Sequence, residues 1–68
     1  MNNSPPEKLG LMCKALRESL GRTQGDVAED IGCSRQLVTE FENGRTYSFK
    51  VFYWYIGHGL EVEKIGKD

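Results

Sequence analysis

Few residues in this chain are of the types that perform catalysis or hold metal ions. His58 is the only histidine among 68 residues, and no second ligand or nucleophile stands near it. Cys13 and Cys33 lack a metal-binding spacing, and in a reducing cytosol we expect both to remain free thiols. A paired-carboxylate motif, a nucleophile with its base and a glycine-rich phosphate loop are also missing. The sequence therefore predicts no enzyme activity, no metal site and no cofactor, and it gives His58 a packing or surface role.

The strongest pattern is a pair of helix signals over residues 23–44, the segment TQGDVAEDIGCSRQLVTEFENG. Thr23 and Asp26 have the spacing of a capping pair that starts a helix, and Gly32 is placed to end that helix in a left-handed conformation. Ser34 then caps a second helix, which ends with the segment. The inward positions of the two helices are Val27, Ala28, Ile31, Val38 and Phe41. Two short helices joined by a tight turn are the layout of a helix-turn-helix unit.

An amphipathic helix is expected before this unit. Ser4 can cap it, a proline follows in the first helical position, and Glu7 stands three residues after the cap. Apolar residues then recur at helical spacing, at Leu9, Met12, Cys13, Leu16 and Leu20. Gly10 is expected to weaken this helix by about 1 kcal/mol relative to alanine. Gly21 ends it.

A further helix is expected after the cap Ser48, up to a break at Gly57. Helical spacing gives it one face of Phe49, Phe52, Tyr53 and Ile56. Three residues point elsewhere, namely Val51, Trp54 and Tyr55. A helix that is apolar on more than one face lies in a core or is covered by a partner, so we expect a second face that meets another protein chain. The alternative is that Trp54 or Tyr55 closes the core with its polar tip in water.

The length of the chain leaves room for one domain, which we expect to cover residues 1–68 with frayed ends at about 1–4 and 66–68. In the tail, Leu60 and Val62 alternate with charges as in a strand, whereas Val62 and Ile65 also fit one helical turn, and both interpretations stay open. No stretch is long and apolar enough to span a membrane, and the N-terminus lacks a signal pattern. We therefore expect a cytoplasmic protein.

The charge is unusual for a nucleic-acid-binding protein, whose footprint is normally basic. The net charge is −1. Residues 23–45 contain two basic side chains, Arg35 and Arg45. The same segment contains five acidic ones, Asp26, Glu29, Asp30, Glu40 and Glu42. The helix-turn-helix unit is thus net acidic, and we expect a single copy to bind DNA weakly.

The residues around this unit resemble a known family, the lambda-repressor/Cro-like helix-turn-helix proteins, also called the XRE family. The likeness rests on the pattern LRE, LGRTQ, VA, IG, SR, V and FENGR between Leu16 and Arg45. It is weaker beyond Arg45, because Tyr47-Ser48-Phe49 stands where the family commonly shows Pro-Ser-Leu. The resemblance implies an all-α fold, a compact bundle of four or five short helices, and binding of double-stranded operator DNA, usually as a dimer.

The same resemblance implies roles for single residues. It places Gln24 at a helix start where family members touch a DNA phosphate, a contact that the helix N-terminus favours. Arg35 and Gln36 open the recognition helix, from which they could bind guanine and adenine through paired hydrogen bonds. The remaining DNA-contacting positions that it implies are Ser34, Thr39, Glu40, Asn43 and Arg45. Arg17 and Glu42 look like a partly buried ion pair between the first and third helices, with a structural role.

A protein partner is suggested by a different set of residues. Leu37 stands near the outer face of the recognition helix, where a polar residue is more usual, and the surplus aromatics are Tyr53, Trp54 and Tyr55. The sequence predicts a small transcriptional regulator of the phage repressor or Cro type that binds operator DNA as a dimer or with a protein partner. The alternative is a protein-interaction module on the same fold, such as an antirepressor that binds a repressor or an antitoxin that binds a toxin. Neither a membrane nor a small-molecule substrate is expected as a partner.

Overall fold

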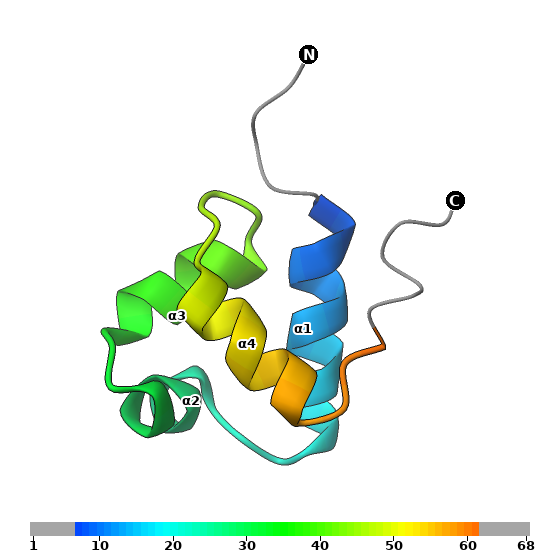
Figure 1. Ribbon diagram of the computed structural model, residues 1–68, viewed down its shortest axis with the longest axis horizontal. Coiled ribbons are helices and arrows are strands. Elements are labelled where there is room, and N and C mark those ends of the chain that lie inside the picture. The colour runs from blue at the N-terminus through cyan, green and yellow to red at the C-terminus, as the bar shows by residue number, and fades with distance from the viewer. Residues whose placement is uncertain (1–6, 62–68) are drawn as a thin grey trace.

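The structure, a computed structural model, describes residues 7–61, and within them the chain forms four helices and no strand. Short connections join the helices, and the described chain starts with the first helix and ends beside it (Figure 1). The helices are α1 (Glu7–Ser19), α2 (Gln24–Ile31), α3 (Arg35–Glu42) and α4 (Phe49–Gly57). The prediction of an all-α bundle of four to five short helices is confirmed.

Several predictions for the two ends lie outside the described residues. They concern the segments 1–4 and 66–68, the cap Ser4, and the pair Val62 and Ile65 on which the alternatives for the tail depended. A single domain over the whole chain stays a prediction. Within residues 7–61, no helix is long and apolar enough to cross a membrane.

The helices begin and end where the cap residues of the sequence indicate. Thr23 accepts a hydrogen bond from the Asp26 N–H on its hydroxyl, while its own N–H donates to the Asp26 carboxylate, each at 3.0 Å. Gly32 ends α2 at φ 86°, a conformation that favours glycine. The hydroxyls of Ser34 and Ser48 accept N–H groups in the first turns of α3 and α4. These caps satisfy backbone groups that the helix ends would otherwise leave unpaired.

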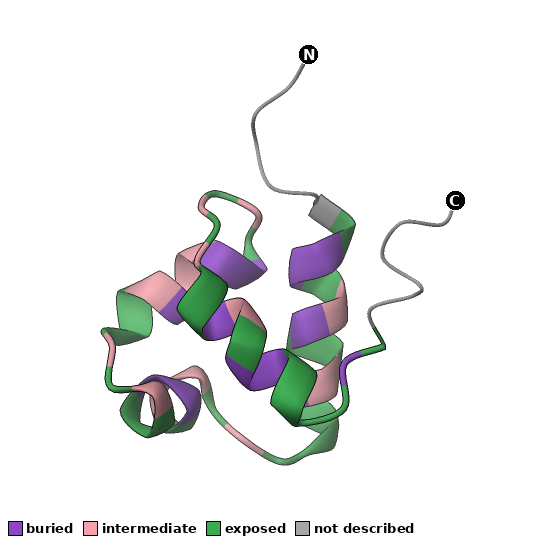
Figure 2. Ribbon diagram, viewed as in Figure 1, coloured by how far each residue is buried: buried purple, intermediate pink, exposed green. Residues whose placement is uncertain are grey.

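The core lies where the inner faces of the four helices meet (Figure 2). Its buried apolar side chains are Leu9, Cys13, Val27, Ala28, Val38, Phe41, Val51, Trp54, Tyr55 and Leu60. Met12, Leu16 and Ile31 are partly buried against this cluster, as expected from their spacing. Leu20 is 42% exposed, although the sequence pattern included it in the stripe of α1, because α1 ends one residue before it.

The faces of α4 are placed differently from the prediction. Val51, Trp54 and Tyr55 are buried, whereas Phe49 and Tyr53 are each 66% exposed. The prediction that Trp54 and Tyr55 form a surface for a protein partner is therefore wrong. The alternative, in which these aromatics close the core, agrees with the structure, except that their polar tips bond to carboxylates of the protein and not to water.

Polar partners explain why the two aromatic side chains can turn inward. The Trp54 indole N–H donates to the Asp30 carboxylate at 3.0 Å, and the Tyr55 hydroxyl donates to Glu42. The two rings also meet edge to face, with centroids 5.2 Å apart. Buried Trp and Tyr need partners for their polar atoms, and Asp30 and Glu42 provide them on this face of α4. Phe49 has no polar atom that requires such a partner.

Gly10 permits a close contact between α1 and the end of α3. A Cβ built at Gly10 would lie 2.2 Å from the carbonyl oxygen of Glu42 and 2.9 Å from that of Phe41. No side chain fits in this space, so the low helix propensity of glycine is offset by the close approach of the two helices. The sequence predicted the low helix propensity of Gly10 but not this close contact between two helices.

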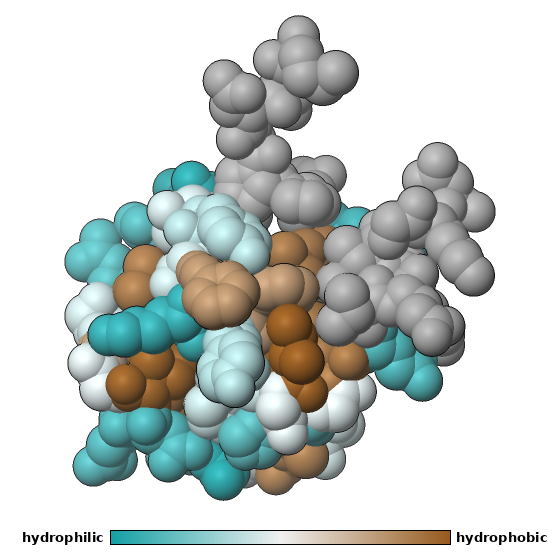
Figure 3. Space-filling model, viewed as in Figure 1, coloured by the Kyte–Doolittle hydropathy of each residue, from teal (hydrophilic) through white to brown (hydrophobic). Residues whose placement is uncertain are grey.

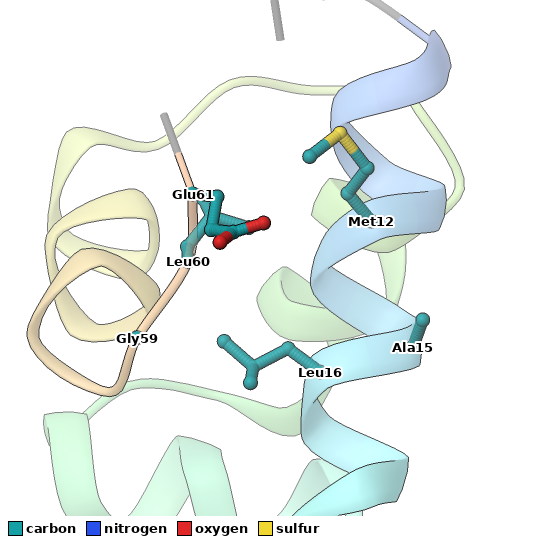
Figure 4. Close-up of a pocket in the computed structure, with 6 residues that line it drawn as sticks. All are labelled: Met12, Ala15, Leu16, Gly59, Leu60 and Glu61. Atoms are coloured by element: carbon teal, nitrogen blue, oxygen red, sulfur yellow. The ribbon is translucent and has the colours of Figure 1, made fainter. Parts of the chain in front are cut away.

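A shallow apolar groove of about 300 Å³ lies between α1 and the segment that follows α4 (Figure 4). Leu16 and Met12 point toward this segment, and none of the lining residues comes from α2 or α3. The lining residues are Met12, Ala15, Leu16, Gly59, Leu60 and Glu61. The groove is therefore separate from the helix-turn-helix unit.

We predict that Gly10→Ala lowers the free energy of unfolding by about 1–3 kcal/mol, because the added methyl group would overpack the contact with α3. Urea unfolding followed by circular dichroism measures this change. The matched control is Gly25→Ala in α2, where a Cβ meets nothing closer than 3.7 Å. This control should be neutral or stabilising by up to about 1 kcal/mol. An equal gain in stability for both variants would contradict the proposed close contact.

Candidate nucleic-acid interface

The turn between α2 and α3 presents the start of α3 to solvent. The N–H groups of Gly32 and Cys33 both donate to the carbonyl oxygen of Ala28, at 2.8 and 3.0 Å, which closes α2. Ser34 follows at once and caps α3. Val38 is buried on the inner side of α3, whereas Ser34, Arg35 and Gln36 are exposed at its start. Such an exposed helix start is suited to contact DNA.

The residues predicted to contact DNA fall into two groups by exposure. The exposed group comprises Ser34, Arg35, Gln36, Asn43 and Arg45, and the half-buried group comprises Gln24, Thr39 and Glu40. The exposed side chains lie at the two ends of α3 and just beyond it. The half-buried side chains make hydrogen bonds within the protein, so fewer of their donors and acceptors are free to bind a ligand.

Gln24 and Thr39 join the start of α2 to the middle of α3. The Thr39 hydroxyl lies 2.8 Å from the Gln24 side-chain oxygen and 3.1 Å from the carbonyl oxygen of Arg35, and its single proton can serve one of them at a time. The Gln24 amide nitrogen donates to Glu42 at 3.1 Å. Because an ionised carboxylate only accepts hydrogen bonds, the nitrogen of this amide must face Glu42 and its oxygen must face Thr39. Both side chains therefore hold the two helices together.

Arg17 and Glu42 form a buried ion pair that joins α1 to the end of α3. The Arg17 Nε and Nη2 atoms donate to the two carboxylate oxygens of Glu42 at 2.8 and 3.2 Å. Arg17 also donates to the carbonyl oxygen of Arg22 at 2.8 Å, which fixes the connection to α2. Within the described part of the chain, no buried side-chain nitrogen or oxygen lacks a partner. This pairing offsets the large cost of burying both charges.

The surroundings of Glu42 determine the charge state of its neighbours. Burial alone would raise the pKa of Glu42, but hydrogen bonds from Arg17, Tyr55 and Gln24 outweigh it and hold this pKa below its ordinary value. Burial and the nearby carboxylate raise the pKa of Tyr55, so its hydroxyl stays protonated and donates to Glu42. Burial and the same charge raise the pKa of the Cys13 thiol to about 12, which keeps it protonated and unreactive.

The bond from Tyr55 to Glu42 is a contact that the sequence did not predict. The two residues lie in different helices, and no spacing rule connects them. The one signal was a tyrosine within an apolar helix, since a buried Tyr hydroxyl requires a polar partner.

A second cluster surrounds Trp54 between α2 and α4. Arg22 lies 3.6 Å from the Asp30 carboxylate, and its guanidinium is 5.8 Å from the centre of the Trp54 ring. His58 stacks on the same ring with a centroid distance of 3.8 Å, and its Nδ1 atom hydrogen-bonds the Trp54 carbonyl oxygen at 2.8 Å. His58 thus packs on the surface, the role expected for it.

These contacts account for much of the acidic charge in residues 23–45. Glu42 is paired with Arg17 and Asp30 with Arg22, and both arginines lie outside that segment. Asp26 accepts the capping hydrogen bond of Thr23, which lowers its pKa. Several of the carboxylates that made the segment look unsuited to DNA thus have structural roles.

Comparison with known proteins supports this description of the unit. A family model described as a helix-turn-helix domain matches residues 8–51, more than half of the chain. No curated protein and no solved structure matches the chain. Domains of this kind are typical of DNA-binding regulators and are not typically enzymes.

We predict that the chain loses stability in acid because of Glu42. The pKa of this carboxyl lies below its ordinary value in the folded chain and is about 4.3 in the unfolded chain. As the pH falls, the unfolded chain takes up a proton first, so the stabilisation present above the unfolded pKa is lost as the pH falls through the folded pKa. Urea unfolding at a series of pH values from neutral to acid measures this loss.

The control for this experiment is Glu42→Gln. It should unfold more easily at neutral pH, by on the order of 3–5 kcal/mol, because Arg17 is left without a counter-charge. Its stability should also depend less on pH than that of the unmodified chain. Asp26 acts in the same direction in both proteins, so the difference between them isolates Glu42. The same pH dependence in both proteins would contradict the assignment.

Proposed function

The chain belongs to the helix-turn-helix domain family, and from this membership we propose that it is a small transcriptional regulator that binds operator DNA. The observation that carries the proposal is the exposed first turn of α3, where Arg35 and Gln36 stand directly after a tight turn from α2. In this proposal α3 lies in the major groove, the width of which accepts one helix. The regulator is of the phage repressor or Cro type and acts in the cytoplasm without catalytic activity.

Base recognition is assigned to the first turn of α3. Arg35 donates two hydrogen bonds to a guanine, and Gln36 exchanges two with an adenine. Gln36 lies 3.2 Å from the Glu40 carboxylate, on the next turn of the helix. This bond orients the Gln36 amide before DNA arrives, and Glu40 disfavours phosphates close to that side of the helix. Ser34 keeps its capping role and offers its hydroxyl at the groove edge.

Contacts to the DNA backbone are assigned to residues around the two helices. Gln24 uses one amide N–H for Glu42, and its second N–H donates to a phosphate at the positive end of α2. Asn43 and Arg45, both exposed, hold the backbone beyond the end of α3. Thr39 acts through Gln24, because its hydroxyl orients the Gln24 amide. We therefore propose Thr39 as a positioning residue.

The small number of cationic contacts determines how such a protein binds. Arg35 and Arg45 are the basic side chains within residues 23–45, while Glu29 and Glu40 oppose phosphates nearby. Affinity for DNA and its dependence on salt both follow the number of phosphates neutralised, so one copy binds weakly and its affinity falls only gently with salt. Operator binding by a dimer or with a protein partner compensates for this.

A second function is favoured by the same charge pattern. The protein could be an interaction module on this fold, either an antirepressor that binds a repressor or an antitoxin that binds a toxin. In that case Leu37, which is half-buried against the core, and the exposed Tyr53 contact the partner protein. DNA selection separates the two functions. Failure to enrich any sequence from random double-stranded DNA at low salt would contradict the operator proposal and favour the interaction module.

We predict that Arg35→Ala relaxes the base preference at one position of the selected DNA. It should also weaken binding to the preferred sequence by about 1–3 kcal/mol. The comparison variant is Arg45→Ala. It should weaken binding to all sequences alike and lower the slope of log affinity against log salt by about one. Fluorescence anisotropy titrations at two salt concentrations measure both effects. Equal losses on all sequences for Arg35→Ala would make this residue a backbone contact.

We predict a different result for Thr39→Val, which preserves shape and removes the hydroxyl. The Gln24 oxygen then loses its partner, so stability falls by about 1–3 kcal/mol and affinity falls on all sequences without a change of base preference. Thr39→Ser keeps the hydroxyl and should restore both quantities. A change of preference at one base pair in Thr39→Val would instead identify Thr39 as a base reader.

A further inference from the structure

The outward face of α4 carries apolar side chains that the fold leaves uncovered. Phe49, Tyr53 and Ile56 follow one another at intervals of four and three residues, so they share one side of the helix. They are 66%, 66% and 37% exposed, and the rings of Phe49 and Tyr53 lie 5.9 Å apart. Figure 3 looks onto this face, where brown and pale side chains gather over α4. We call these three residues the α4 patch.

Tyr47, in the connection before α4, extends the uncovered surface. It is 49% exposed, and its ring lies 6.0 Å from that of Phe41 and 5.9 Å from that of Phe52. Aromatic side chains at the edge of a patch can shield its centre from water. Single exposed apolar residues are normal, whereas apolar side chains gathered in one patch are candidates for an interaction site.

We propose that the α4 patch binds the α4 patch of a second copy of this chain, with the two helices antiparallel about a two-fold axis near Tyr53. A symmetric interface requires that each residue meets its own mate or that two residues exchange partners. Phe49 lies four residues before Tyr53 and Ile56 three residues after it. Antiparallel pairing therefore sets Tyr53 against Tyr53 of the second copy and Phe49 against Ile56 of the second copy. The patch is thus complementary to itself.

The charges of α4 also favour a second copy. The helix has no acidic residue, and Lys50 is its one basic residue. A partner with a strongly charged surface would therefore gain little electrostatic attraction from α4. In the antiparallel pair the two Lys50 positions lie three residues on either side of the axis, about 9 Å apart along the helices. Their repulsion is then small in water.

The exposed area suits a reversible homodimer. An aromatic side chain buries roughly 150–250 Å² when fully covered, so Phe49 and Tyr53 together offer on the order of 250 Å² in each copy. Ile56 and Tyr47 add to this apolar centre. A stable interface needs about 800 Å² on each side, of which a centre of this size is a substantial part.

The pairing leaves the helix-turn-helix unit free, since the α4 patch includes no residue of α2 or α3. Two copies would then carry two recognition helices to two half-sites of one operator. This last step rests on the proposed function, whereas the pairing itself does not need DNA. The two can therefore fail separately.

Sedimentation equilibrium of the full chain without DNA, from micromolar to submillimolar concentration, tests the pairing. Tyr53→Arg should raise the dimer dissociation constant by about tenfold or more, because it places two like charges at the axis. The matched control is Leu11→Arg on α1, where the native side chain is 62% exposed. It should leave the dissociation constant unchanged. Circular dichroism melting should show both variants folded, as expected for exposed positions.

The geometry has its own test. Tyr53→Cys should form a disulfide-linked dimer under mild oxidation, because the two residues meet at the axis, whereas Leu11→Cys should not. A chain that stays monomeric at every concentration overturns the proposal. So does a dimer that Tyr53→Arg leaves intact, since the interface would then lie elsewhere. In either case, sequence preference in DNA binding would still be able to support the proposed function.

Discussion

The carboxylate of Glu42 is the point at which all four helices meet, because it accepts hydrogen bonds from Arg17 of α1, Gln24 of α2 and Tyr55 of α4 while it belongs to α3. The backbone at the same residue also touches α1, since Gly10 leaves room for its carbonyl oxygen. A 68-residue chain has a small core, and apolar packing alone specifies the angles between short helices poorly. One fully satisfied polar centre can add that specificity.

This arrangement explains the apparent conflict between a DNA-binding fold and an acidic segment. The net charge of a segment counts every carboxylate alike, whereas the structure separates those that hold helices together from those that face solvent. Glu42 and Asp30 are paired with arginines from α1 and the connection that follows it. Within residues 7–61, Asp26, Glu29 and Glu40 have no basic partner of this kind, and in the proposed function they repel phosphates and limit the affinity of a single copy. Charge counted along a sequence is therefore a coarse guide to charge at an interface.

Local signals in the sequence predicted α2 and α3 well, because caps and apolar spacing depend on neighbours within one or two turns. Thr23, Gly32 and Ser34 are examples. The orientation of α4 was not predictable in this way, since it is apolar on both sides and the choice depended on polar partners distant in the sequence. Asp30 and Glu42 provide those partners for Trp54 and Tyr55. The sequence likewise predicted only that Gly10 lowers the stability of α1. That glycine also permits the close packing of α1 against α3 depends on a helix distant in the sequence.

The separation of Arg35 and Gln36 from the polar centre has a consequence for the history of such a protein. The side chains at the start of α3 are exposed, whereas the bonds that set the position of α3 come from Glu42 and Thr39, on its later turns. Substitutions of Arg35 and Gln36 therefore change little of what keeps the chain folded. A lineage with this scaffold could acquire new target sites through few mutations, each tolerated as it arose. The residues that contact a target would then change faster in evolution than the residues that maintain the fold.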